Sequence, residues 1–166
     1  MPDVAIALGS NIDPEVNLKV CAQHLRRHWP NIRFSSVYKT KAQLHEDQND
    51  FLNAAAVFET DQSIEDTMKI LEQIEQELGK APPFRYGPRT IDIDILLYGD
   101  FVTSNQQLVT SNVVIPHPKM HERLFVLAPF CELIHPDGQH PALKISWEDL
   151  RKSVENQPIE TTEITL

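Results

Sequence analysis

The sequence predicts an α+β fold, an antiparallel sheet covered by helices, and three observations favour it. The chain has 166 residues, a length that fits one domain. Hydrophobic residues make up 41% of it, which is enough to build a core and argues against disorder. Short apolar runs that are typical of strands alternate with stretches of helical periodicity. These features together predict a single mixed domain.

The first part of the chain predicts a strand followed by a helix. Residues 4–8 form an apolar run that ends in the turn-forming residues 9–11, which is typical of a buried strand. Asp13 can cap a helix that begins at Pro14, because proline is favoured at the first helical position. Pro30 ends this helix, since it removes a backbone donor and clashes with the preceding turn.

The middle of the chain predicts two strands and the clearest helix. Residues 32–38 are rich in β-branched and aromatic side chains, residues 41–50 are polar and unpatterned, and residues 51–60 are apolar again. This pattern indicates a strand, a loop and a second strand. Residues 64–78 predict an amphipathic helix that Gly79 can end in a left-handed conformation. The apolar positions of this helix are Ile64, Met68, Leu71, Ile74 and Leu78.

After this helix the sequence predicts a loop, a strand and smaller elements. Residues 80–89 contain three prolines and a glycine, which argues against regular structure. Residues 90–97 alternate between isoleucine and aspartate in their first half, so they predict a strand. A hairpin is expected to lead to residues 113–115, and a short helix is expected near residues 122–128.

The order of these elements is strand, helix, strand, strand, helix, strand, which is that of a ferredoxin-like βαββαβ core. The C-terminal hairpin and helix are additions to this core. Residues 1–166 are therefore expected to form one domain that ends in a frayed, polar and acidic tail over approximately residues 150–166.

The charge balance limits the possible partners. The chain has 15 Lys and Arg residues and 24 Asp and Glu residues, so its formal net charge is −9. Nucleic acids and anionic membranes repel such a chain, and its apolar runs are shorter than a membrane span. With two cysteines, Cys21 and Cys131, and no basic leader, the protein is expected to be reduced and cytoplasmic, without a nucleic-acid or membrane partner.

Two aspartates, Asp92 and Asp94, share one face of the strand predicted over residues 90–97. Strand geometry places them roughly 6.5–7 Å apart along the backbone, and the two charges repel each other unless a cation lies between them. Hard carboxylate oxygens favour Mg²⁺, whose coordination is often completed by water and substrate phosphates. The alternative is a solvent-facing strand edge that binds no ion.

The loop before this strand is basic, although the chain as a whole is acidic. Lys80, Arg85 and Arg89 lie in a stretch that contains no acidic side chain. Cationic side chains beside a carboxylate-bound Mg²⁺ suit a polyphosphate, because Arg can bind phosphate oxygens bidentately. An ordinary solvated surface loop is the alternative.

A third candidate site contains two histidines, His117 and His121. Their four-residue spacing could place both on one helix face, as in zinc sites, but Pro118 interrupts a helix between them. We therefore interpret His117 as a hydrogen-bond donor to phosphate, with Lys119 and Arg123 adding positive charge. A pair of surface histidines at a helix start is the alternative.

Four motifs also carry a resemblance to a known family. They are Ala7–Asn11, Phe51–Ala55, Gly87–Gly99 and Ile115–Arg123, of which GPRTIDIDILLYG at Gly87–Gly99 is the most specific. In this order, over roughly residues 4 to 138, they resemble the 6-hydroxymethyl-7,8-dihydropterin pyrophosphokinase family of folate biosynthesis. The resemblance implies a ferredoxin-like fold and the transferase activity of a 2-amino-4-hydroxy-6-hydroxymethyldihydropteridine diphosphokinase. Such an enzyme transfers a diphosphate from ATP to the hydroxymethyl group of the pterin and releases AMP.

The resemblance further implies roles for individual residues. Asp92 and Asp94 would hold two Mg²⁺ ions that bridge the ATP phosphates, and the pterin ring would stack between two phenylalanines. The implied catalytic residues are Lys80, Arg89, His117 and Arg123. The implied ATP-binding residues are Glu75, Lys80, Arg89, Ile95, His117 and Arg123. The implied pterin-binding residues are Thr40, Phe51, Asn53, Asp92 and Phe125.

The sequence departs from the family pattern at a few positions. Lys80 stands where an arginine is usual, Glu72 stands where a glutamine is common, and residues 40–45 differ from the usual pterin loop. These departures leave open a weakly active or non-catalytic paralogue that binds a pterin or a nucleotide. A metal-dependent phosphohydrolase is a further alternative, although no motif supplies an activating base. The expected ligands are ATP, Mg²⁺ and a hydroxymethyl-dihydropterin, and the expected oligomeric state is a monomer.

Overall fold

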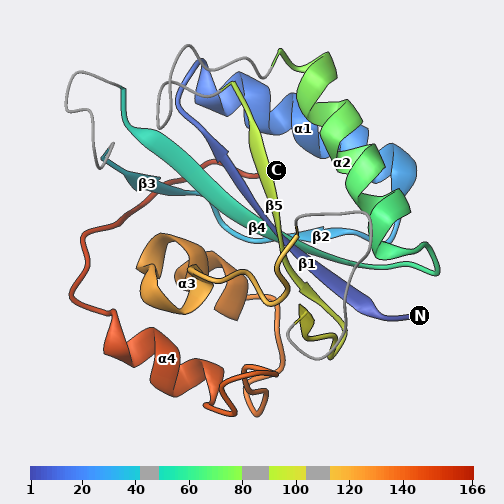
Figure 1. Cartoon of the computed structure of the whole chain (residues 1–166). Coiled ribbons are helices and arrows are strands. Elements are labelled where there is room, and N and C mark those ends of the chain that lie inside the picture. Colours follow the sequence, from blue (N-terminus) through green and yellow to red (C-terminus); the bar gives the residue numbers. More distant parts are fainter. Residues whose placement is uncertain (42–48, 80–89, 104–112) are drawn as a thin grey trace.

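The computed structural model describes residues 1–41, 49–79, 90–103 and 113–166, which form an antiparallel sheet with helices on both faces (Figure 1). The strands are β1 (Asp3–Ser10), β2 (Arg33–Phe34), β3 (Tyr38–Thr40), β4 (Phe51–Glu59), β5 (Asp92–Tyr98) and β6 (Glu160–Thr161). The helices are α1 (Pro14–His28), α2 (Ile64–Glu77), the 3₁₀ helix η2 (Met120–Glu122), α3 (Leu124–Cys131) and α4 (Trp147–Ser153). The strand order is β5-β1-β4-β3-β6, with β2 paired to β4 beside this path.

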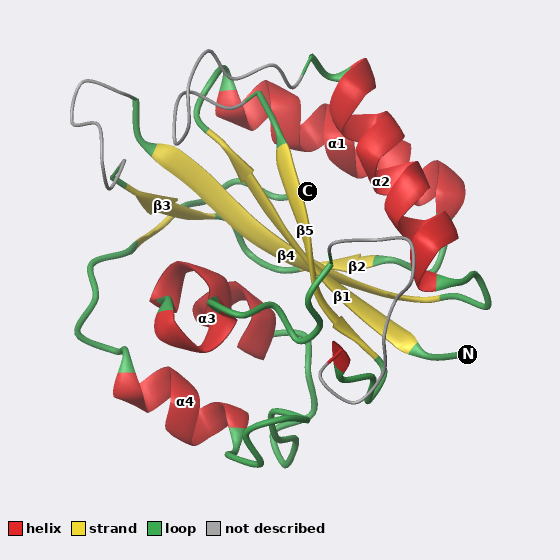
Figure 2. Ribbon diagram, viewed as in Figure 1, coloured by secondary structure: helices red, strands yellow, loops and turns green. Residues whose placement is uncertain are grey.

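Helices α1 and α2 lie on one face of the sheet and α3 and α4 on the other (Figure 2), and a hydrophobic cluster fills the layer on each side. Alternation along β1 directs Val4, Ile6 and Leu8 toward α1 and α2, where they join the larger cluster. The neighbouring residues Ala5 and Ala7 face α3 and α4 instead. Because the side chains of Ala5 and Ala7 are short, little side-chain material covers this second face of the sheet where α3 is absent.

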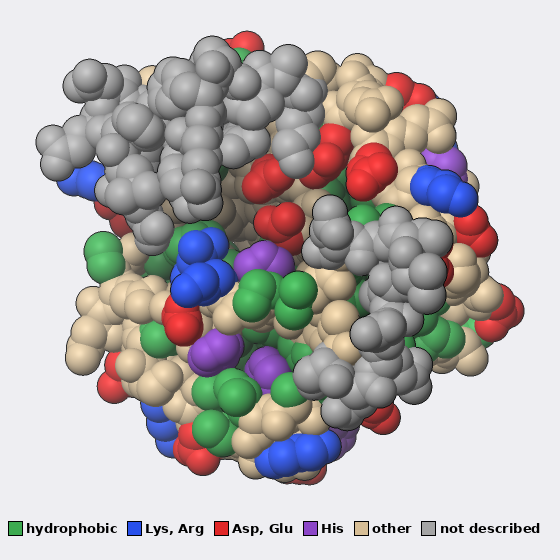
Figure 3. Space-filling model, viewed as in Figure 1, with side chains coloured by type: hydrophobic (Ala, Val, Ile, Leu, Met, Phe, Trp, Pro, Cys, Tyr) green, Lys and Arg blue, Asp and Glu red, His purple; other side chains and the backbone are tan. Residues whose placement is uncertain are grey.

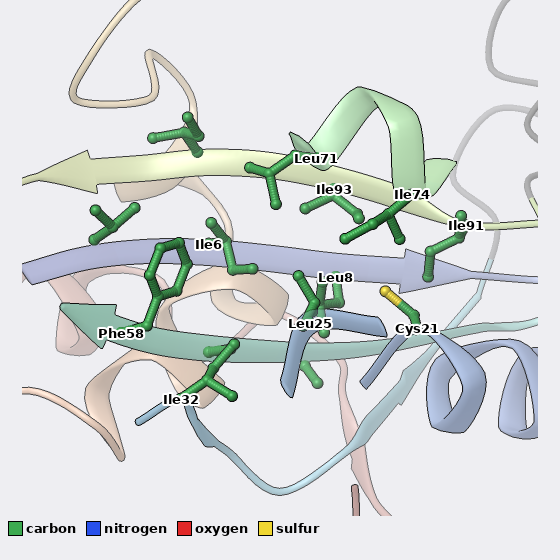
Figure 4. Close-up of a cluster of buried hydrophobic side chains, with 14 of the residues drawn as sticks. Ile6, Leu8, Cys21, Leu25, Ile32, Phe58, Leu71, Ile74, Ile91 and Ile93 are labelled. Atoms are coloured by element: carbon green, nitrogen blue, oxygen red, sulfur yellow. The ribbon is translucent and has the colours of Figure 1, made fainter. Parts of the chain in front are cut away.

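Helix α2 follows the predicted periodicity closely. The Ser63 hydroxyl caps it by accepting a hydrogen bond from the backbone N–H of Asp66 at 3.1 Å. Leu71 and Ile74 point from α2 toward the sheet (Figure 4) and are buried in the larger cluster. Gly79, just after the helix, has φ 82°, the left-handed conformation expected of it. The helix predicted over residues 64–78 is therefore confirmed.

The predicted α+β class and its element order are confirmed, with one strand divided in two. The strand expected over residues 32–38 is β2 followed by β3. The backbone N–H of Ala55 donates a hydrogen bond to the hydroxyl of Ser35 at 2.8 Å. In a regular ladder this N–H would donate to a carbonyl of the neighbouring strand instead. This side-chain bond interrupts the strand between the two halves.

The C-terminal additions differ in detail from those expected. Thr103 and Ile115 are joined by two hydrogen bonds of 2.8 Å, so the chain doubles back as a hairpin would. Residues 113–115 are nevertheless not a strand, and residues 104–112 lie outside the described part of the chain. The helix expected near residues 122–128 is η2 followed by α3, and the short helix α4 is additional. None of the helices that the structure describes has the length and apolar character needed to cross a membrane.

The terminal segment, expected to be a frayed polar tail, is instead attached to the sheet. Strand β6 pairs with β3, and the Thr162 hydroxyl donates to the carbonyl of Val37 at 2.8 Å. Ile164 and Leu166 pack against the larger hydrophobic cluster. The expectation of fraying was wrong because these two apolar side chains, spaced two residues apart, reach the core from an otherwise polar segment.

Replacing both Ile164 and Leu166 by serine is expected to lower the free energy of unfolding by about 2 kcal/mol, since two half-buried apolar side chains are lost. Chemical denaturation measures this change. The matched control replaces the exposed residues Glu163 and Thr165 by serine and should leave stability unchanged. Equal stabilities of the two double variants would show that the tail contributes nothing to the fold.

Candidate active site

An open area of the sheet carries the aspartate pair. Strand β5 places Asp92 and Asp94 on the face toward α3, because Ile93 between them is buried on the opposite face. Asp92 lies opposite Gly9 of β1, and Asp94 lies opposite Ala7. These small neighbours leave space above the sheet. Asp92 is half-buried and Asp94 is exposed, so both carboxylates face that space.

A row of residues crosses the sheet at this level. Gly9 lies between Asp92 on β5 and Asn53 on β4. With two strand spacings between them, Asp92 and Asn53 are roughly 10 Å apart across the sheet. The amide nitrogen of Asn53 donates to the hydroxyl of Thr40 at 2.9 Å, and Phe51 pairs with Thr40 in the ladder. A carboxylate therefore stands at one end of the row, and an amide, a hydroxyl and an aromatic ring stand at the other.

Glu75 supports the aspartate pair from α2. It is buried, and its Oε1 accepts a hydrogen bond from the backbone N–H of Ile93 at 2.7 Å. Among the strands that the structure describes, β5 is at the edge of the sheet, so this outward N–H has no partner on a described neighbouring strand. A carboxylate is a strong acceptor for such a donor. Glu75 thus fixes β5 at the residue that separates Asp92 from Asp94.

A pocket of about 380 Å³ lies between α2, β5 and residues 113–118. Its apolar lining includes Leu71, Ile93, Ile95 and Val113, and its polar lining includes Glu72, Glu75, Asp94 and His117. Figure 3 shows acidic side chains gathered around the hollow in this face, with basic and histidine side chains beside them. A pocket with both apolar and polar lining residues suits a flat heterocycle that carries polar or charged groups.

His117 is held next to β5 by its backbone, whose N–H donates to the carbonyl of Leu96 at 2.9 Å. Its ring Nδ1 accepts from the backbone N–H of Lys119 at 3.2 Å, so the proton of the neutral ring is on Nε2. Burial lowers the pKa of His117, and the nearby Arg123 lowers it further, while Asp92 acts in the opposite direction. The ring is therefore a neutral Nε2–H donor at neutral pH.

Arg123 precedes the first residue of α3, and its guanidinium lies 5.8 Å from the ring centroid of Phe125. Arg123 is near enough to His117 to lower its pKa, so a cationic guanidinium and a neutral ring N–H donor lie in the same area. Phe125 is half-buried and packs against the cluster beneath α3. Lys119 is exposed and pairs with Glu122 at 3.4 Å, which offsets the charge that it was expected to add.

The zinc alternative receives no support. His121 belongs to η2, and its ring lies 5.8 Å from that of His140, so it does not share a helix face with His117. Within the described ranges, no three His, Cys, Asp or Glu side chains are arranged to hold a metal ion. Asp92 and Asp94 remain a fitting donor set for Mg²⁺, which takes one or two carboxylates and completes its octahedron with water and phosphate oxygens.

The structure thus brings most of the predicted residues into two neighbouring groups. Asp94, Ile95, Glu75 and His117 line the pocket, while Thr40, Phe51 and Asn53 gather at the far end of the row. Lys80 and Arg89, the expected basic residues of the preceding loop, lie outside the described residues. Gly9 and Ala7 form the floor of this area, and Ala55 lies opposite Ala7 on β4; these small residues could not be assigned to the site from sequence, because only the strand register places them beside it.

Comparison with known proteins identifies similar sequences over most of the chain. A family model described as 7,8-dihydro-6-hydroxymethylpterin-pyrophosphokinase matches residues 5–135. The chain is 41% identical over 131 residues to the 2-amino-4-hydroxy-6-hydroxymethyldihydropteridine pyrophosphokinase of Bacillus subtilis, covering 77% of this chain and 75% of the relative. It is 40% identical over 133 residues to the protein of the same name from Haemophilus influenzae, covering 77% and 79%.

Solved structures agree on the fold. A Plasmodium falciparum HPPK-DHPS crystal structure with pteroate matches with a TM-score of 0.69 and 15% identity, covering 98% of this chain. Another, the A437G variant with STZ-DHP, matches with a TM-score of 0.68 and 15% identity, covering 92% of this chain. The chain spans about half the length of these solved chains, 47% and 45% respectively. At this identity the likeness supports the fold alone.

Proposed function

The chain belongs to the 7,8-dihydro-6-hydroxymethylpterin-pyrophosphokinase family, and on that premise we propose how its residues perform the reaction. It is a transferase of folate biosynthesis that moves a diphosphate from ATP to the hydroxymethyl oxygen of the dihydropterin, with AMP as the second product. The non-catalytic alternative finds no support in the similar proteins, which carry the enzyme's name.

One observation supports the proposed mechanism: the aspartate pair lies between the pocket beside α2, which Asp94 lines, and the group of polar and aromatic side chains around Asn53. A reaction that joins a nucleotide phosphate to a heterocyclic alcohol needs this order, with the charged centre in the middle. Catalysis then consists mainly of positioning the two substrates and stabilising negative charge.

We place the nucleotide in the pocket between α2 and residues 113–118. Its base would lie between the apolar walls, with Ile95 among them, and Glu75 would lie near the nucleotide. The Nε2–H of His117 and the guanidinium of Arg123 would donate to phosphate oxygens. Because His117 is neutral, it contributes a directed hydrogen bond, and the formal positive charge on this side comes from Arg123.

The aspartate pair is the proposed metal site. Members of the family use ATP and typically Mg²⁺, and we propose that Asp92 and Asp94 hold two such ions. When bound, Mg²⁺ neutralises phosphate charge and thereby makes the β-phosphorus accessible to the attacking oxygen. Lys80 and Arg89 are proposed to bind further phosphate oxygens, Lys80 without the bidentate geometry that an arginine would offer.

The dihydropterin is placed over the floor residue Gly9. Asn53, oriented by its hydrogen bond to Thr40, would pair with polar atoms on the edge of the ring. Phe51 and Phe125 would contact the ring faces. The hydroxymethyl group would then point along the row toward Asp92, roughly 10 Å from Asn53, where the transferred phosphate is held.

The remaining proposals concern the molecule as a whole. We propose that residues 1–166 form a single pyrophosphokinase domain, that it is monomeric and that it works in the cytoplasm. The free thiols of Cys21 and Cys131 support a reducing location. Burial raises the pKa of Cys21 to about 12 and that of Cys131 to about 11, so neither is a reactive thiolate.

The product nucleotide tests the reaction. With ATP, Mg²⁺ and 6-hydroxymethyl-7,8-dihydropterin, we expect AMP to form in step with the pterin diphosphate, as measured by chromatography. Omission of the pterin is the control and should abolish AMP formation. Formation of ADP would indicate transfer of a single phosphoryl group, and free phosphate without the pterin would indicate a phosphohydrolase; either result contradicts the proposal.

A further inference from the structure

One side chain from the C-terminal segment holds the backbone on both sides of Arg123. The Oε1 atom of Gln157 accepts a hydrogen bond from the N–H of Leu124 at 2.8 Å. Its Nε2 donates to the carbonyl of Glu122, also at 2.8 Å. Arg123 is the residue between these two peptide groups. A single amide therefore brackets the residue that we have placed at the phosphates.

The hydrogen bonds of Gln157 satisfy backbone groups at the start of α3. Leu124 is the first residue of α3, and N–H groups in the first turn of a helix have no intrahelical acceptor. Arg123 occupies the N-cap position, and its side chain makes no capping hydrogen bond. Gln157 therefore satisfies a donor at the start of α3, as a capping side chain does, but from a distant segment of the chain. This arrangement leaves the Arg123 side chain available for the site.

The position of Gln157 is itself set by α4, which lies beside α3 (Figure 1). Trp147 and Leu150 of α4 are buried in the cluster that also contains α3. The chain turns after this helix, and the N–H of Gln157 donates to the carbonyl of Val154 at 3.0 Å. The packing of α4 against α3 therefore places Gln157 next to the start of α3. Gln157 lies beyond residues 5–135, the part that the family model matches.

The junction that Gln157 holds is short and irregular. Arg123 has an extended backbone, with φ −130° and ψ 115°, between the 3₁₀ helix η2 and α3. The direction of its side chain therefore depends on how these two helices meet. Without the amide of Gln157, the peptide groups on either side of Arg123 can turn toward water. A shift of about 1 Å in a phosphate-binding group is enough to weaken binding and catalysis.

We propose that Gln157 is a positioning residue of the nucleotide site and acts through Arg123. This inference rests on the proposed function, in which Arg123 binds the ATP phosphates. The exposed Gln157 itself contributes no contact to the substrate. It fixes the backbone from which the guanidinium reaches the site, so its loss should weaken nucleotide binding while the chain stays folded.

Calorimetric titration of the full chain with Mg²⁺ and a non-hydrolysable ATP analogue tests this. Gln157→Ala should weaken binding about tenfold, because two amide hydrogen bonds that orient Arg123 are lost. The midpoint of thermal unfolding should fall by no more than a few degrees, as for the loss of a helix cap, so the variant remains folded during the titration. The matched control is Asn156→Ala, which changes the exposed neighbour and should bind like the parent protein. Binding by Gln157→Ala equal to that of the control would overturn the inference.

The same measurement in an Arg123→Ala background separates this inference from the proposed function. If Gln157 acts through Arg123, adding Gln157→Ala to Arg123→Ala causes no further loss of affinity. An equal additional loss in both backgrounds would overturn the inference, because Gln157 would then act elsewhere. If Arg123→Ala alone binds the analogue as tightly as the parent, the proposed phosphate contact of Arg123 fails, and the role of Gln157 fails with it.

Discussion

Asp92→Ala and Asp94→Ala are each expected to lower kcat by about a thousandfold or more, because removal of a carboxylate ligand displaces the Mg²⁺ that offsets the phosphate charge. The two positions lie on one face of β5, opposite Gly9 and Ala7. Gly9 and Ala7 have no carboxylate side chain that could replace the lost ligand. Formation of AMP at saturating ATP and pterin measures the loss.

Folding should survive these substitutions. Asp94 is exposed and Asp92 half-buried, and β5 is held through the backbone of Ile93 and the buried isoleucine face. The midpoint of thermal unfolding should therefore stay close to that of the parent. Asp100→Ala, an exposed acid in the turn after β5, is the matched control for loss of one negative charge and should retain activity.

Two results would contradict the assignment. Turnover close to that of the parent protein in either variant would show that the carboxylate does not hold the metal ion. Unfolding of a variant under conditions where the parent is folded would show that the carboxylate is structural. Binding of the ATP analogue with and without Mg²⁺ provides a second measurement, since only the parent should gain affinity from the ion.

The part of this site that a single sequence can predict is the part that depends on local periodicity. Asp92 and Asp94 alternate with buried isoleucines, so their shared face follows from strand geometry alone. Helix α2 is also local, because a cap, an apolar stripe and Gly79 agree with one another. Both were therefore predicted with nearly the bounds that the structure shows.

The rest of the site depends on contacts between distant segments. The register that sets Gly9 between Asp92 and Asn53 results from packing of whole strands, and no short motif encodes it. Helix α4 is too short for a periodic signal, so the position of Gln157 could not be foreseen. Likewise, the polar composition of the C-terminal segment gave no signal that Ile164 packs against the core. These features require the three-dimensional structure.

Gly9→Leu is expected to weaken binding of the dihydropterin by about a hundredfold, because extra atoms in a closely fitted site cost about 1–3 kcal/mol. Gly9 lies at the centre of the row, between Asp92 and Asn53. A Cβ atom at this position would lie 3.6 Å from the side-chain oxygen of Asn53, an ordinary contact. The remaining atoms of leucine would then occupy the space proposed for the ring.

A graded series makes this prediction specific. Gly9→Ala adds only the tolerated Cβ, so its effect on the KM for the pterin should be small, with Gly9→Val intermediate. Folding should be retained, since larger side chains favour strands more than glycine does. Binding of the ATP analogue should persist in all three variants, because Gly9 is not among the residues that line the pocket beside α2. An unchanged KM for the pterin in Gly9→Leu would place the pterin away from the floor of the sheet and would leave Asn53 without its proposed role.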